Sequence, residues 1–104
     1  MTVAEAMKKM ILLSNGNRHD INHFLKVHAY ALTIGACEGL SQAQRYTLEL
    51  AAIVHDIGIH KAEEKYGRNT GKYQELEGPG EARTMLTALS WPLEVIDRVC
   101  YLVG

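Results

Sequence analysis

Apolar residues recur at intervals of three and four along most of this chain, which is the spacing of one face of an α-helix. This periodicity predicts helices over residues 2–14, 20–38, 41–56, 61–65, 81–89 and 92–103. No stretch alternates convincingly between apolar and polar residues, so no sheet is expected. The pattern therefore predicts an all-α fold, a compact bundle of about five or six helices that forms a single domain over residues 1–104.

Capping chemistry predicts where the helices begin and end. A Ser or Thr followed three residues later by Glu or Gln forms a capping box, and the chain contains two: Thr2 with Glu5 and Ser41 with Gln44. We expect Asp20 to cap the second helix, because a carboxylate binds free helix N–H groups, and Gly39 to end it. One face of that helix should be formed by His23, Val27, Ala31 and Ile34.

Residues 66–77 are polar and lack clear periodicity, and Gly78, Pro79 and Gly80 follow them. Because glycine and proline interrupt regular structure, we expect a loop here and a new helix only after it. Loops this long in a small domain are often functional. The segment is therefore a candidate lid over a substrate.

Composition and charge exclude several classes of function. Hydrophobic residues make up 47% of the 104 residues, enough for one modest core, and the formal net charge is −1. Because no basic stripe is present, nucleic-acid binding is not expected. No apolar run approaches a membrane span, and the N-terminus lacks the order of a secretion signal, which favours a cytoplasmic protein. Cys37 and Cys100 lie in apolar patterns and should be buried free thiols.

The dipeptide His55-Asp56 ends an apolar helical run and is followed closely by Gly58. Burying an imidazole and a carboxylate at the end of a core helix is costly unless something compensates, and a divalent cation binds both groups. Adjacent helical residues point about 100° apart, so both can reach one ion only near the helix end. His23 lies in an apolar stretch of the preceding predicted helix and is the third candidate ligand.

A His on one helix followed by His-Asp at the end of the next resembles the HD superfamily of metal-dependent phosphohydrolases, over roughly residues 18–104. The resemblance implies an HD-domain-like bundle that hydrolyses a small phosphorylated molecule such as a nucleotide. It implies a divalent ion (Mn, Fe, Mg, Zn, Ni or Co) held by His23, His55 and Asp56. Asp56 would also take part in catalysis, together with His60, whose alternative interpretation is an ordinary surface histidine.

Other charged residues are weaker candidates. Arg68, Lys72 and Arg83 are candidate phosphate contacts, because guanidinium and ammonium groups match phosphate oxygens, although each is also typical of an ordinary surface. Glu63 or Glu64 would approach the ion if the chain follows its relatives. His28 points about 140° away from His23 and is expected to have a partly exposed or hydrogen-bonded structural role. The second His-Asp pair, His19-Asp20, is interpreted as part of a helix cap.

Fuller members of the HD superfamily add a further Asp on a helix beyond the segment matched here by residues 93–103. Only three ligands therefore match. Either the chain is a fragment of a longer protein, or water, Glu77 or a partner subunit would complete the site. A chain that stops where relatives add covering helices predicts a homodimer, with buried contacts from Leu93, Ile96, Val99 and Val103. The alternative function is a non-catalytic metal-binding or oligomerising helical domain.

Overall fold

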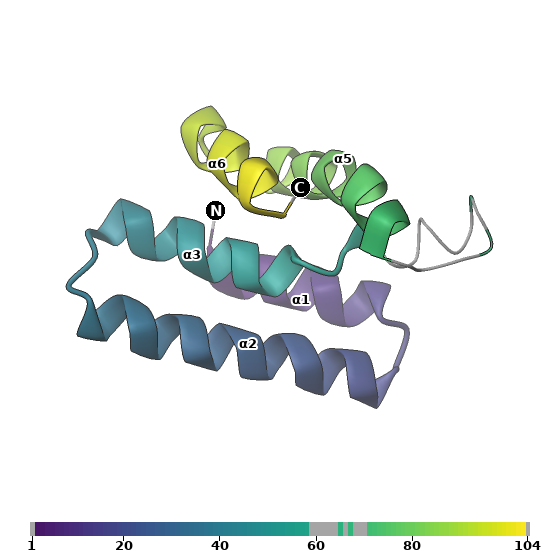
Figure 1. The fold of residues 1–104 in the computed structure, drawn as a ribbon, viewed down its shortest axis with the longest axis horizontal. Helices are drawn as coiled ribbons and strands as arrows, with labels where there is room; N and C mark the ends of the chain where they lie inside the picture. Colours follow the sequence, from purple (N-terminus) through teal and green to yellow (C-terminus); the bar gives the residue numbers. More distant parts are fainter. Residues whose placement is uncertain (1, 59–64, 66, 68–70, 104) are drawn as a thin grey trace.

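The computed structural model describes residues 2–58, 65, 67 and 71–103, and within these the chain is helical with no strand (Figure 1). The all-α prediction is confirmed. The helices are α1 (Val3–Leu13), α2 (Arg18–Cys37), α3 (Gln42–Val54), α5 (Gly71–Ala88) and α6 (Leu93–Val103). No helix in the described ranges is both long and apolar enough to cross a membrane.

Both predicted capping boxes are confirmed. The Glu5 N–H donates to Thr2 Oγ1 at 3.1 Å, and the Thr2 N–H donates back to the Glu5 carboxylate at 2.8 Å. Ser41 and Gln44 make the same reciprocal pair at the start of α3, at 3.2 and 3.0 Å. Each box satisfies two backbone groups that the first helical turn otherwise leaves without partners.

The predicted start of α2 is wrong by three residues. Asn17, not Asp20, is the N-cap, and its Oδ1 accepts the Asp20 N–H at 3.1 Å. Asp20 instead lies in the first turn, where the helix dipole favours a negative charge. Gly39 does follow the helix end with a φ of +65°, a conformation that glycine adopts without steric cost.

The core surrounds α3, which contacts α1, α2 and α6. In Figure 1, α3 runs antiparallel to α2 and lies between α2 and the α5–α6 pair. Leu50, Ile53 and Val54 are fully buried at this centre. The end of α3, where the candidate ligands lie, is therefore fixed by the best-packed part of the molecule.

The buried face of α2 differs from the predicted one. Ala31 is buried as expected, but Ile34 is 56% exposed. Phe24 and Gly35 are buried instead, so the face that meets α3 is centred about one residue away from the predicted stripe. This rotation leaves His23 at the edge of the interface, in reach of both α3 and solvent.

The prediction of a loop up to residue 77 and a break at Gly78–Gly80 is wrong, because α5 begins at Gly71 and continues through Pro79. An interior proline costs about 3 kcal/mol, and contacts with α6 at Pro79 and at the preceding Gly78 oppose that cost. The Pro79 carbonyl accepts a hydrogen bond from Cys100 Sγ at 3.4 Å. A Cβ at Gly78 would lie 3.7 Å from the Val103 carbonyl, which shows how closely the two helices approach. Residues 66 and 68–70 lie outside the described residues.

The expected interface residues of α6 divide into two groups. Ile96 and Val99 are 3% and 0% exposed within this single chain, so they cannot be dimer contacts as predicted. Leu93 is 66% exposed, and homodimer formation through such residues stays a prediction. Cys100 is buried and free as expected, whereas Cys37 is free but exposed, which corrects the prediction for that thiol.

Candidate metal centre

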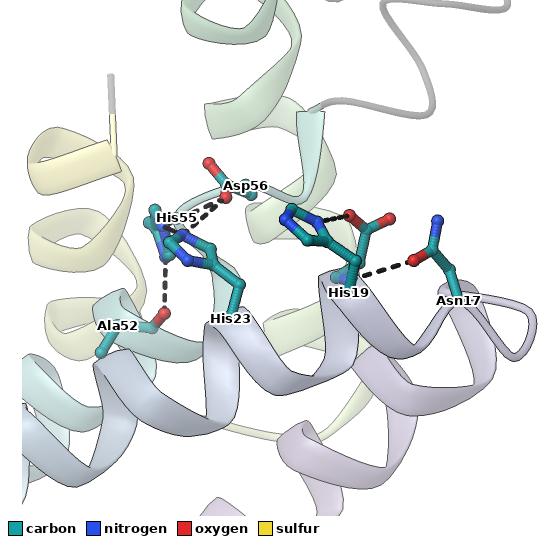
Figure 2. Close-up of polar contacts among 7 residues, drawn as sticks. Asn17, His19, His23, Ala52, His55 and Asp56 are labelled. Carbon is teal, nitrogen blue, oxygen red and sulfur yellow. Dashed lines mark hydrogen bonds and ion pairs between the residues drawn. The ribbon is translucent and has the colours of Figure 1, made fainter.

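The candidate centre forms where the first turns of α2 meet the end of α3 (Figure 2). His23 projects from α2, His55 is the C-cap of α3, and Asp56 lies in the turn that follows. Packing of α2 on α3 brings together residues that are more than thirty positions apart in the sequence. α3 ends at Val54, and the turn that follows directs the adjacent side chains of His55 and Asp56 toward the same point.

Three donor atoms converge in this corner. His23 Nε2 lies 3.2 Å from His55 Nε2 and 3.3 Å from Asp56 Oδ2, and His55 Nε2 lies 3.2 Å from the same Oδ2. The sequence predicted that these three residues would share one site, and the structure brings them together. Their ligand atoms all lie within 4.8 Å of one another, so the group could hold a metal ion.

The backbone of α3 fixes the orientation of the His55 ring. His55 Nδ1 lies 2.7 Å from the Ala52 carbonyl oxygen. A carbonyl only accepts, so Nδ1 carries the hydrogen, and the lone pair of a neutral His55 is on Nε2 and faces the site. Metal-binding histidines almost always donate their other ring N–H in this way. Sequence reasoning missed Ala52, because its contribution comes from a carbonyl that the helix end leaves without an intrahelical partner.

The arrangement attracts positive charge. The hydrogen bond between His55 and the Asp56 carboxylate raises the pKa of His55, although burial of the ring lowers it. The same hydrogen bond lowers the pKa of Asp56 below its usual value, again against burial. A proton on His55 Nε2 separates two electron-rich atoms that otherwise face each other. A divalent ion between them would do the same with more charge.

The centre is open on one side, because the side chains of His23, His55 and Asp56 are 49%, 31% and 31% exposed. Cavities of about 510 and 380 Å³ lie beside α3 near the start and along the length of α6, and none of the three residues lines them. Two imidazoles and one carboxylate suit Mn, Fe, Co, Ni or Zn better than Ca. Three ligands also leave coordination positions for water or a substrate.

The remaining candidates do not join this group. Arg83 Nη2 donates to Asp97 Oδ1 at 2.8 Å, an exposed pair between α5 and α6. Glu77 pairs with Lys65 at 3.1 Å and is not among the clustered donors in the described part of the chain. His60, Arg68, Glu63 and Glu64 lie outside the described residues, as does the side chain of Lys72.

His28 has the structural role predicted for it. Its Nε2 lies 3.0 Å from Glu49 Oε1, and the two side chains are only 17% and 14% exposed. The pair joins α2 to α3 farther along the interface. It thus holds the two helices together beside the candidate centre.

Compared with known proteins, the chain matches no family model, no curated protein and no solved structure. The resemblance to the HD superfamily therefore depends on the motif residues alone. What this chain does must be argued from the geometry of its own centre.

Proposed function

We propose that this protein is a metal-dependent phosphohydrolase of the HD type, which binds a divalent transition-metal ion through His23, His55 and Asp56. The observation that carries the proposal is the convergence of three donor atoms within 4.8 Å. The Ala52 carbonyl supports it, because that contact directs the His55 lone pair toward the other two donors.

The chemistry of the donors fits a catalytic ion. Such an ion lowers the pKa of water and neutralises charge on a phosphoryl oxygen. The residues of this chain bind and orient the ion: the two rings supply neutral nitrogens, and Asp56 supplies the negative charge. The Ala52 carbonyl holds the His55 ring in one tautomer. The open side of the centre gives a phosphate ester access to the ion.

The substrate class comes from the resemblance of the His23 and His55-Asp56 pattern to HD phosphohydrolases. It suggests a small phosphorylated molecule, such as a nucleotide. A non-catalytic metal-binding domain is the alternative, and it is favoured by one observation. Arg83, a candidate phosphate contact, already pairs with Asp97.

Metal analysis and a hydrolysis screen test the proposal. Protein purified without chelator should contain a divalent metal, and His55→Ala should lose it. Hydrolysis of phosphate esters, nucleoside monophosphates included, should require added Mn²⁺ and disappear on chelation. His28→Gln is the matched control, because its amide can still bond Glu49 and it leaves the three donors intact.

The outcomes separate the two functions. A bound metal without any hydrolysis would favour the non-catalytic domain. Hydrolysis that persists in His55→Ala or after chelation would refute the proposed function, because the activity would then not depend on this centre.

A further inference from the structure

His19 lies four residues before His23, so the two side chains lie on the same face of α2 one turn apart. Figure 2 shows both rings rising from this face on the side of the helix where Asp56 lies. Pairs of histidines with this spacing bind a single Zn²⁺ from one helix face in metalloproteases. The interpretation of His19-Asp20 as a helix cap is wrong, because Asn17 is the N-cap of α2.

The His19 ring is not among the three clustered donors of the described residues, so it has to turn about its side-chain bonds to reach the ion. Its Nδ1 lies 3.7 Å from Asp20 Oδ1, which is too long for a hydrogen bond but places the carboxylate beside this nitrogen. A hydrogen on Nδ1 would leave the lone pair on Nε2, which could then bind an ion. A carboxylate beside one ring nitrogen is a usual outer partner of a metal-bound histidine.

The His19 ring is also free to move toward the centre. Its side chain is 93% exposed, so no packing holds it away from His23. Turning and ordering one exposed side chain costs conformational entropy. The additional metal–nitrogen bond opposes that cost, because metal binding by a complete set of ligands is strong enough to drive the folding of small domains.

We propose that His19 is a fourth protein ligand of the ion held by His23, His55 and Asp56, an inference that rests on the proposed metal centre. Four protein ligands complete a tetrahedral Zn²⁺ site. They leave two positions open on an octahedral ion such as Mn²⁺, enough for a water molecule and a phosphoryl oxygen.

Ring-nitrogen NMR of the whole chain titrated with Zn²⁺ tests the assignment directly. Among the five histidines, the rings of His19, His23 and His55 should shift to the metal-bound positions, and His28 should stay unchanged because Glu49 holds it. If only His23 and His55 shift, the metal centre stands and the role of His19 is refuted. If no ring shifts, the metal centre itself fails.

A calorimetric titration with Zn²⁺ gives a second, independent readout. Loss of a residue that only hydrogen-bonds a metal ligand costs about 10- to 100-fold in metal affinity. Loss of a direct ligand should cost no less, so His19→Ala should bind Zn²⁺ at least about tenfold more weakly. The control is Asn22→Ala, an exposed change on the same helix that should leave the affinity unchanged. Equal affinities in His19→Ala and the unsubstituted chain would overturn the proposal.

Discussion

Acidification should weaken Zn²⁺ binding by at least about tenfold for each pH unit below the pKa of His55, because a proton and the ion compete for the same Nε2. The structure shows why this competition is strong. The hydrogen bond to Asp56 raises the pKa of His55, so this ring keeps its proton to a higher pH than it would without the carboxylate. The Ala52 carbonyl leaves Nε2 as the only nitrogen of this ring that faces the centre.

The size of the effect on stability follows from linkage. Zn²⁺ at 100 times its Kd adds about 2.7 kcal/mol to the free energy of unfolding. Two pH units below the pKa of His55, the apparent Kd has risen at least to the same Zn²⁺ concentration, and the gain falls to about 0.4 kcal/mol or less. Without Zn²⁺ the sign is opposite, because a raised folded-state pKa stabilises at low pH and this stabilisation is lost as pH rises through it.

Thermal unfolding with and without Zn²⁺ across this pH range measures both trends. For a domain of this size 1 kcal/mol shifts Tm by about 4–8 °C, so the gain and its loss are both well resolved. His28→Gln should show the same Zn²⁺-dependent shift as the unsubstituted chain, whereas His55→Ala should show none. A Zn²⁺-dependent rise in Tm that is the same at every pH would refute the reasoning.

Two further predictions concern the packing that positions the centre. Gly35→Ala should stabilise the protein by about 0.5–1 kcal/mol, because an added Cβ meets only ordinary contacts of 3.6 Å or more; a loss of stability in urea unfolding would contradict this. Leu50→Ala should cost about 2–5 kcal/mol, since Leu50 is 0% exposed. Leu12→Ala, at a 64% exposed position, is its control and should change stability by less than about 0.5 kcal/mol.

Local sequence chemistry predicted the parts of the fold that depend on a few neighbouring residues. The capping boxes at Thr2 and Ser41 formed as expected, because each needs only residues within one helical turn. The grouping of His23 with His55 and Asp56 was predicted from the resemblance of the motif together with the apolar helices that carry it. His55 and Asp56 end an apolar helix, and His23 lies on the helix that pairs with it.

The errors arose where tertiary contacts outweighed local preference. Pro79 reads as a helix break, yet contacts with α6 keep α5 continuous through it. Ile34 fits a helical stripe, but the packing of α2 on α3 selects the neighbouring face that carries Phe24 and Gly35. Neither outcome can be obtained from spacing alone, because it depends on which helix becomes the neighbour.

The separation of His23 and His55 by 32 residues has a consequence for folding. A cation bound by both would act as a reversible crosslink that closes the α2–α3 hairpin. A crosslink over a loop of this length restricts the unfolded chain by about 3–4 kcal/mol in the chain-entropy description. Metal supply would then control the folded population as well as the chemistry, and chelation would release the hairpin together with the ion.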